Sequence, residues 1–203
     1  MTDSRDAAIY NTCPIYVAPR HGCFKRLEQD GRRHVAGGDG MYIEVKSGHM
    51  HACVRIASFA MPYGHVNEFI ELANGPVPSR LLQNFVTKAV DDAPHEIAAI
   101  VRPEGASYEL ASPHVLSSSP SHIEYSEVEL DHIVIDIHSH GRHRAFFSAT
   151  DDASDLSRFG PYVAIVVGNC TSYGEVQWAA RFVCGLNLIP LDVNGPLLRG
   201  ILR

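Results

Sequence analysis

The sequence lacks the features that mark several large classes of protein. No block of five like charges occurs, and the net charge is −6 at pH 7, so nucleic acid is not the expected partner. No apolar run approaches the roughly 18 residues that a membrane-spanning helix needs. The first residues, Met-Thr-Asp-Ser-Arg-Asp, do not form a charged and then apolar leader. We therefore expect a soluble, cytoplasmic protein.

Cysteine is scarce and unpatterned. The 5 cysteines are odd in number, and no two of them form a Cys-x-x-Cys pair. Neither a disulfide framework nor a zinc ribbon is expected from such a pattern. The thiols are predicted to be reduced and to behave as small buried apolar groups.

The chain has room for one sizeable core or for one domain with an elaborated flank, because it contains 203 residues. Residues 1–75 are predicted to be a β-rich N-terminal region. Asp30-Gly31 is a strong hairpin signal there, and strands are expected over 41–45 and 51–59. We expect the second region, 76–203, to be a separate domain and to carry the chemistry.

Helical and strand patterns alternate in this second region. Ser79 begins a helix with one apolar stripe, which Pro94 stops. Strands are expected over 96–101 and 131–137, short strands within 102–128, and an antiparallel pair over 162–167 and 176–183. The order predicts an α/β (α+β) fold with a mostly antiparallel sheet flanked by helices.

Two histidines, His138 and His140, stand two residues apart at the end of a segment rich in β-branched residues, 131–137. Residues i and i+2 of a strand point to the same side, so both imidazoles can hold one metal ion. Ser148 is predicted to be the N-cap of a short helix, which puts Asp151 in its first turn. Asp151 is the candidate third ligand, because two histidines and a carboxylate leave one open position on a tetrahedral zinc ion.

A second His-x-His pair shows how little the spacing means by itself. His49 and His51 also lie near a predicted strand, but no Ser-x-x-Asp unit follows them. We expect no metal there. Because Ser-x-x-Asp alone is usually a capping box, the metal prediction depends on the combination of the two patterns.

The combined pattern resembles the JAMM (MPN+) metalloprotease family, whose members carry His-x-His, seven residues, Ser, two residues and Asp. His138, His140, Ser148 and Asp151 are in register with it. The resemblance also implies a glutamate on the strand after the first helix, and Glu96 stands at that position. Without the downstream motif, Glu96 would be interpreted as an ordinary strand-end glutamate with a partner of its own.

The resemblance implies both a reaction and a set of partners. The segment 136–152 looks most like the bacterial PRTRC system protein A branch, and the likeness extends over roughly residues 76–190. It implies a zinc-dependent peptidase or isopeptidase that acts at the C-terminal tail of a ubiquitin-like protein, in processing or deconjugation. E2-like and ThiF-like proteins of the same system are the implied partners.

The same resemblance implies a role for each site residue. His138, His140 and Asp151 hold Zn2+, which activates a water and polarises the scissile carbonyl. Glu96 takes the proton of the water and passes it to the leaving amine. The hydroxyl of Ser148 stabilises the tetrahedral oxyanion.

Other zinc-hydrolase patterns fit these residues less well. Ala99 stands where a His-Glu-x-x-His protease has its second histidine, and Arg142 stands where a metallo-β-lactamase has a carboxylate. Two functions of other classes stay open. The chain could be a non-catalytic, metal-containing MPN-type scaffold, or an amidase for small molecules or carrier proteins.

Three further side chains have open roles. His143 could close the metal site as a fourth ligand, although its loop position favours an exposed or substrate-facing role. His132 and Asp136 share the strand parity of His138, so they could orient the imidazoles from behind.

Overall fold

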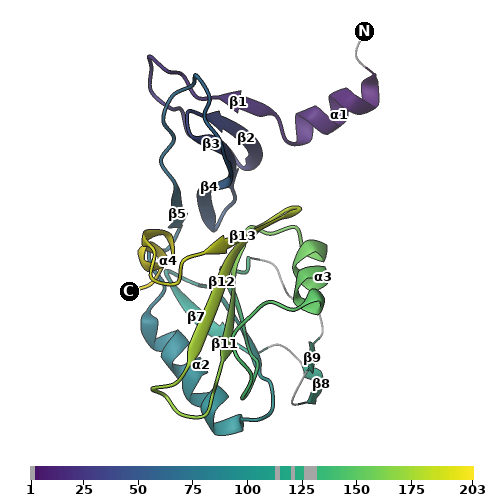
Figure 1. The fold of residues 1–203 in the computed structure, drawn as a ribbon, viewed down its shortest axis with the longest axis vertical. Helices are drawn as coiled ribbons and strands as arrows, with labels where there is room; N and C mark the ends of the chain where they lie inside the picture. Colours follow the sequence, from purple (N-terminus) through teal and green to yellow (C-terminus); the bar gives the residue numbers. More distant parts are fainter. Residues whose placement is uncertain (1–2, 113–114, 120–121, 126–131) are drawn as a thin grey trace. The chain divides into compact units, whose positions relative to one another are not determined.

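The computed structural model describes residues 3–112, 115–119, 122–125 and 132–203. The chain forms two compact units, Met1–Ala73 and Asn74–Arg203, here called the first and the second unit (Figure 1). The predicted fold class is confirmed, since a mostly antiparallel sheet is flanked by helices and a β-rich part precedes it. Within these residues, no helix combines the length and the apolar character that a membrane crossing requires.

The first unit is a five-stranded sheet preceded by a helix. The strands lie in chain order, and β1 runs parallel to β2 while the other neighbours are antiparallel. Their bounds are Ile15–Val17 (β1), Gly31–Gly37 (β2), Gly40–Lys46 (β3), Met50–Ser58 (β4) and Phe69–Leu72 (β5).

The hairpin predicted at Asp30-Gly31 is wrong. Gly31 is the first residue of β2, and the tight turn lies at the other end of that strand, where Gly37 pairs with Gly40. Glycine is required at this turn, since a Cβ on Gly40 would lie 2.1 Å from the carbonyl oxygen of Ala57. Residues 22–29, which come directly before Asp30, form no strand, and Leu27 N instead donates to Glu44 Oε1 at 2.8 Å.

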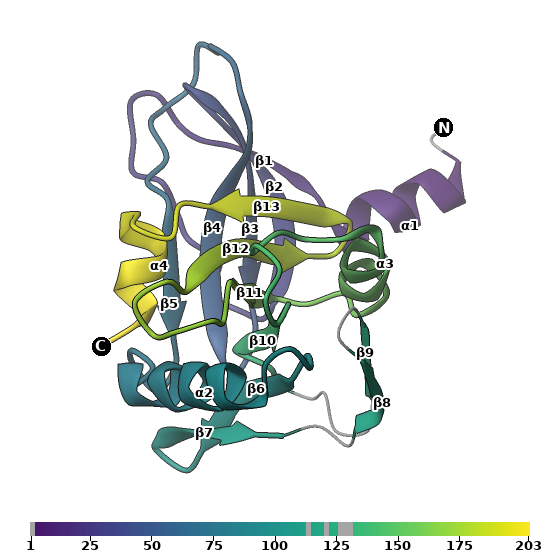
Figure 2. The same ribbon diagram turned by 60° about the horizontal axis from the view of Figure 1, so that its bottom comes forward.

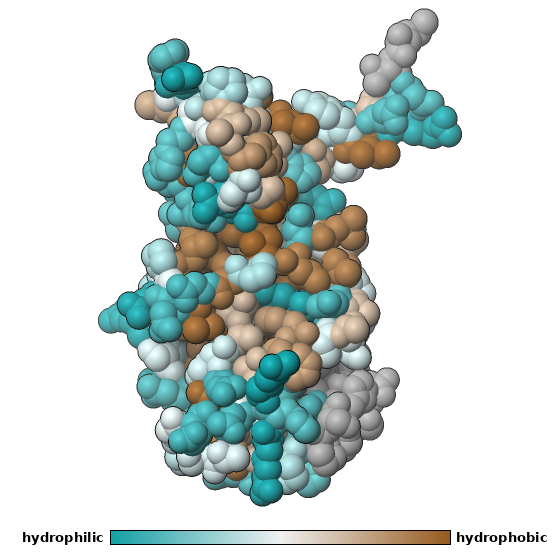
Figure 3. Space-filling view, viewed as in Figure 1, coloured by the Kyte–Doolittle hydropathy of each residue, from teal (hydrophilic) through white to brown (hydrophobic). Residues whose placement is uncertain are grey.

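The helix α1 (Ser4–Thr12) was not expected from the sequence. It buries none of its residues and has no apolar stripe, so periodicity could not reveal it. Its local signal is the N-cap, because the Asp3 side chain accepts a hydrogen bond from Arg5 N at 2.9 Å. The surface of α1 is mostly hydrophilic in the space-filling view (Figure 3).

The second unit is built on a six-stranded sheet in the order β13-β12-β11-β10-β6-β7. Only the central pair β10 and β11 is parallel. The strands are Ala98–Glu104 (β6), Ser107–Ala111 (β7), Ile135–Ser139 (β10), Tyr162–Gly168 (β11), Gln177–Cys184 (β12) and Asn187–Leu191 (β13), and a separate hairpin joins Val115–Ser119 (β8) to His122–Tyr125 (β9).

Helices cover both faces of this sheet. The helices α2 (Ser79–Asp92) and α4 (Pro196–Ile201) lie on one side and α3 (Ala149–Ser157) on the other (Figure 2). The strand β11 is buried along its whole length, as expected for a central strand covered on both faces. The predicted helix from Ser79 and the antiparallel pair β11 and β12 are confirmed.

The region predicted as short strands, 102–128, contains β7, β8 and β9. Residues 113–114, 120–121 and 126–131 of this part of the sequence lie outside the described residues.

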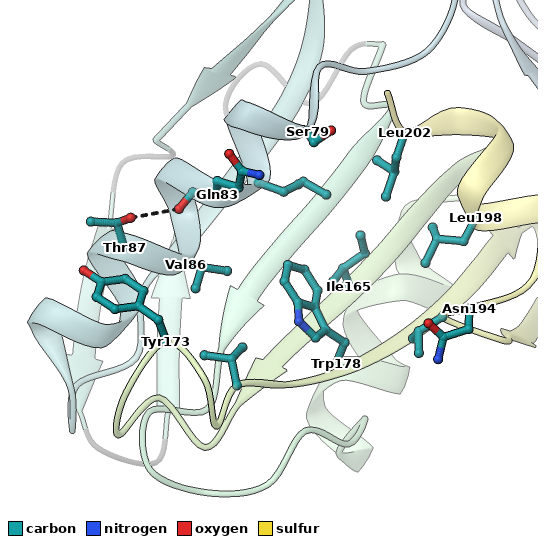
Figure 4. Close-up of a pocket in the computed structure, with 13 residues that line it drawn as sticks. Ser79, Gln83, Val86, Thr87, Ile165, Tyr173, Trp178, Asn194, Leu198 and Leu202 are labelled. Atoms are coloured by element: carbon teal, nitrogen blue, oxygen red, sulfur yellow. Dashed lines mark hydrogen bonds between the residues drawn. The ribbon is translucent and has the colours of Figure 1, made fainter.

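A cavity of about 550 Å³ lies on the α2 and α4 side of the sheet (Figure 4). Val86 of α2, Leu198 of α4 and Ile165 and Trp178 of the sheet are among its lining residues. Side chains alternate between the faces of a strand, so Ile165 points away from the face that its neighbour Val166 shares with His138. The cavity is therefore separate from the histidine site described next.

Candidate metal centre

The strand β10 presents His138 and His140 on one side of the sheet. His138 is the fourth residue of β10, and the backbone N–H of His140 continues the ladder by donating to Val167 O at 2.8 Å. This extended backbone keeps the alternation of side chains through His140. The two Nε2 atoms lie 3.2 Å apart, as predicted for a pair that faces one point.

Asp151 completes a group of three ligand atoms. Its Oδ1 lies 3.3 Å from His138 Nε2, and its Oδ2 lies 3.8 Å from His140 Nε2. Atoms bound to one zinc ion at about 2.0–2.2 Å in tetrahedral geometry stand about 3.3–3.6 Å apart. The Nε2–Nε2 and Oδ1–Nε2 separations are close to this spacing, and one ligand atom from each of the three residues lies within 4.8 Å of the other two, so the residues fit a zinc ion without large rearrangement. In the described part of the chain, this is the one group of His, Cys, Asp and Glu side chains found to be suited to a metal.

The N-terminus of α3 fixes the position of Asp151. The Ser148 hydroxyl accepts a hydrogen bond from Asp151 N at 3.2 Å, and Asp151 Oδ2 accepts one from Ser148 N at 2.6 Å. This is the reciprocal capping box that the Ser-x-x-Asp pattern predicts. The box occupies Oδ2 and leaves Oδ1 facing His138, so the cap and the ligand roles use different oxygen atoms of one carboxylate.

Buried ion pairs hold α3 against the sheet. Arg181 of β12 donates to Asp155 at 2.7 Å and also pairs with Asp152, and Arg158 pairs with Asp136 of β10. Asp136 and Arg181 lie in one row across the sheet, because both are in register with Ala164. Removing one partner of such a buried pair leaves an uncompensated charge, so the network makes the position of α3, and with it Asp151, costly to change.

Glu96 lies in the loop before β6 and is buried, with 6% of its surface exposed. Ala98 pairs with His138 in the antiparallel ladder, and Ser139 N donates to Ile97 O. Continuing this register places Glu96 opposite His140, and residues directly opposite each other share a face of the sheet. The charge of the Glu96 carboxylate contributes to raising the pKa of His138, so the two side chains lie within electrostatic range of each other.

Two small residues hold the Glu96 loop against the histidine segment. The buried Ser139 hydroxyl, on the face opposite to the histidines, accepts a hydrogen bond from Ile97 N at 3.0 Å. Gly141 has φ +51°, and a Cβ there would lie 2.3 Å from Pro94 O. Glycine is therefore required at 141 both by the left-handed conformation and by the close approach of the chain that leads to Glu96.

The electrostatics of the three ligand candidates favour binding of a cation. Burial tends to raise the pKa of Asp151, but its hydrogen bonds with His138 and Ser148 hold that pKa well below the usual range. Burial also tends to lower the pKa of His138, but the charge of Asp151 outweighs it and the pKa lies above its usual value. Burial and the neighbouring His138 lower the pKa of His140. These directions favour the ionised form of Asp151, which is the form that binds a cation.

The backbone of Arg144 contacts the His140 ring. Their hydrogen bond tends to raise the pKa of His140, against burial and the neighbouring His138. Because Nε2 faces the other candidate ligands, Nδ1 is the ring atom that remains for the backbone.

The other candidate residues are not part of the group of three candidate ligands. His143 is exposed. His132 is also exposed, has φ +68° and precedes β10, so the prediction that it shares a strand face with His138 is wrong. Asp136 pairs with Arg158, although its charge also contributes to raising the pKa of His138.

Two comparisons with known families divide the chain near the same place as the fold. Residues 3–73 match a family described as a domain of unknown function, DUF2016. Residues 78–181, just over half of the chain, match prokaryotic homologs of the JAB domain. The chain belongs to this JAB family. The matched JAB segment contains Glu96, Ser148 and the three ligand candidates. The JAB family includes peptidases as well as inactive members.

No curated protein matches the chain. Among solved structures, protein DSY2949 from Desulfitobacterium hafniense is similar at 14% identity, over 58% of this chain and 89% of that one, with a TM-score of 0.42.

Several residues that position this site were not predicted from the sequence. The position of Ser139 was predictable, because the middle residue of His-x-His in a strand must face the opposite side of the sheet. The position of Arg181 was not, since its partners Asp152 and Asp155 come from a distant segment. Phe146, whose ring packs edge-on against His140 at 4.7 Å between centroids, also has no sequence signature.

Proposed function

We propose that this JAB-family chain is a zinc-dependent peptidase or isopeptidase that hydrolyses an amide bond at the C-terminal tail of a ubiquitin-like protein. The observation that carries the proposal is the convergence of three ligand atoms with a separate buried carboxylate. A metal site with a purely structural role needs the ligands alone, whereas hydrolysis also needs a group that moves protons.

His138, His140 and Asp151 would hold the ion and leave one position open. When bound, zinc supplies a Lewis acid that polarises the scissile carbonyl and acidifies the attacking water. Glu96 accepts a proton from this water as the oxygen attacks the carbonyl carbon. When the carbon–nitrogen bond breaks, Glu96 returns the proton to the leaving amine.

The Ser148 hydroxyl can donate a hydrogen bond in this reaction. Its oxygen accepts the hydrogen bond of the helix cap, which uses a lone pair and not the O–H group. The O–H can therefore donate to the oxyanion of the tetrahedral intermediate. Because the cap fixes the side chain, little reorganisation is needed as the charge develops.

The substrate and the partners come from the resemblance of the segment 136–152 to the PRTRC system protein A branch. A ubiquitin-like protein or its conjugates would be the substrate, and E2-like and ThiF-like proteins would act in the same system. The resemblance supports a processing or deconjugating role.

The test compares Glu96→Gln with the matched control Glu109→Gln. Glu109 also follows α2, but it pairs with Arg102 at 2.6 Å on the outer strand β7. Each variant is assayed for zinc content and for cleavage of a ubiquitin-like protein fused after a Gly-Gly tail. We expect Glu96→Gln to retain zinc and to lose turnover by about 10²–10⁴-fold, which is the usual contribution of a general base.

Glu109→Gln should cleave at close to the wild-type rate. Wild-type turnover by Glu96→Gln would remove the general base from the proposal. Zinc-loaded wild-type protein that cleaves neither the fusion nor small amides would favour a scaffold, and cleavage of small amides alone would favour an amidase.

A further inference from the structure

The loop that follows the metal ligands is basic in an acidic protein. The net charge of the chain is −6, yet no Asp or Glu occurs between Asp136 and Asp151. Arg142, His143 and Arg144 fall in this interval, after His140 and Gly141, and all three are exposed. We call these three residues the basic rim.

The two arginines of the basic rim differ from three other arginines of the second unit. Arg158 and Arg181 are buried in ion pairs, and Arg102 pairs with Glu109. Neither Arg142 nor Arg144 pairs with a carboxylate in the part of the chain that the structure describes. The rim therefore carries positive charge that no ion pair within the described residues neutralises.

The backbone under the basic rim is held firmly. His143 N donates to His140 O at 2.9 Å, Asn169 N donates to His143 O at 2.5 Å, and Cys170 N donates to Gly141 O at 2.8 Å. Gly168 lets the loop cross close by, because a Cβ there would lie 2.2 Å from Ala145 N. The loop thus presents its side chains from a fixed position relative to the metal ligands.

Phe146 links the basic rim to the ligand group. Its ring packs edge-on against His140, and the Arg144 guanidinium lies 5.8 Å from the centroid of the same ring. Phe146 is 42% exposed. Only one aromatic ring therefore separates the Arg144 charge from a metal ligand, which places the rim within reach of a chain bound at the metal.

We propose that the basic rim selects peptide segments that carry an acidic side chain next to the scissile bond. The proposal rests on the proposed function, since it names a feature of the substrate of that same site. A guanidinium matches a carboxylate in charge and in its fork geometry, and Phe146 offers an apolar surface to the stem of the acidic side chain. A lysine at the same substrate position would be repelled.

The test measures binding, so it does not depend on turnover. The probes are three labelled peptides, amidated at the C-terminus, with one Gly-Gly core and Glu, Gln or Lys beside it. Each is titrated by fluorescence anisotropy into the zinc-loaded full chain carrying Glu96→Gln. We expect the Glu peptide to bind about fivefold to tenfold more tightly than the Gln peptide, and the Lys peptide more weakly, as for partly exposed charge pairs.

The double change Arg142→Glu and Arg144→Glu should abolish or invert this order. The matched control is Arg80→Glu, which makes the same change of charge at an exposed position of α2, on the other side of the sheet. It should leave the order unchanged. The preference should also weaken in about 1 M salt, where charges are screened beyond about 3 Å.

Equal affinity for the three peptides, or no measurable binding of any, would overturn the proposal. So would an unchanged order in the double variant. These outcomes are distinct from a failure of the proposed function, which would appear as missing hydrolysis by the wild-type chain.

Discussion

The two His-x-His pairs of this chain have the same spacing and different surroundings. In the first unit, His51 Nε2 lies 3.0 Å from Glu44 Oε1, whereas His49 precedes β4 and its Nδ1 lies 3.3 Å from Ser47 Oγ. The two side chains thus have separate partners. In the second unit, His138 and His140 turn their Nε2 atoms toward each other and toward Asp151.

The carboxylates near the two pairs explain the difference. Glu44 is fully buried, and its oxygens accept hydrogen bonds from Leu27 N and Arg33 as well as contacting His51. Both oxygens of Glu44 therefore already have partners within the first unit. Asp151 instead receives a backbone hydrogen bond on Oδ2 and keeps Oδ1 toward His138. The two pairs therefore share their spacing, and the second pair differs by having a candidate third ligand whose Oδ1 is not used by the helix cap.

The largest effect is expected when each histidine pair loses one member. His138→Ala should remove most of the zinc from the purified protein, because two ligands bind zinc far less tightly than three. His51→Ala should keep about one zinc per chain. Metal analysis of the two variants decides the comparison, and a loss of zinc in His51→Ala would show that the first unit contributes to metal binding.

The buried arginines offer a second comparison between the units. Arg33 bonds Glu44 at 2.7 Å, and Arg181 bonds Asp155 at 2.7 Å. Changing either to Ala leaves a buried carboxylate without its arginine, and breaking a buried ion pair in this way typically costs about 3–5 kcal/mol. Thermal unfolding should show both losses.

Only Arg181→Ala should also weaken zinc binding, measured by competition with a chelator, because α3 carries Asp151. If zinc affinity is unchanged in Arg181→Ala, the ion pairs do not position Asp151.

The smallest effect is expected at the helix caps. Ser148→Ala should cost about 1 kcal/mol of stability, since α3 is packed on the sheet and loses its N-cap. Asp3→Ala should change stability by less than about 0.5 kcal/mol, because α1 buries no residue.

Ser148→Ala should retain zinc but lower turnover by the equivalent of about 2.7–4 kcal/mol, as for an oxyanion donor. Unchanged turnover with lower stability would leave Ser148 a cap alone.

The elements that the sequence could predict are those with a local signal. The helix from Ser79 has an apolar stripe, β11 is a run of buried β-branched residues, and Ser148 with Asp151 forms a capping box. Each of these depends on neighbours within one or two turns of chain. The geometry of the three candidate ligands was likewise predictable, because strand alternation and helix capping are local rules.

The elements that the sequence could not predict depend on distant contacts. The Asp30-Gly31 turn failed because the residues before it are held by Glu44 and not by a second strand. The strand prediction at Glu96 was two residues early, since β6 begins at Ala98, where pairing with His138 begins. Likewise, nothing near Arg181 in the sequence indicates that it pairs with α3.

The most direct test of the central claim is X-ray absorption at the zinc edge on the purified full chain. The account predicts one zinc with nitrogen and oxygen ligands at about 2.0–2.2 Å, two of them imidazoles, and loss of one imidazole in His140→Ala. The alternative is a zinc ion bound by cysteine, because the chain has 5 free cysteines. X-ray absorption would detect their sulfur atoms. A sulfur ligand at about 2.3 Å, or an unchanged spectrum in His140→Ala, would contradict a zinc site built from His138, His140 and Asp151.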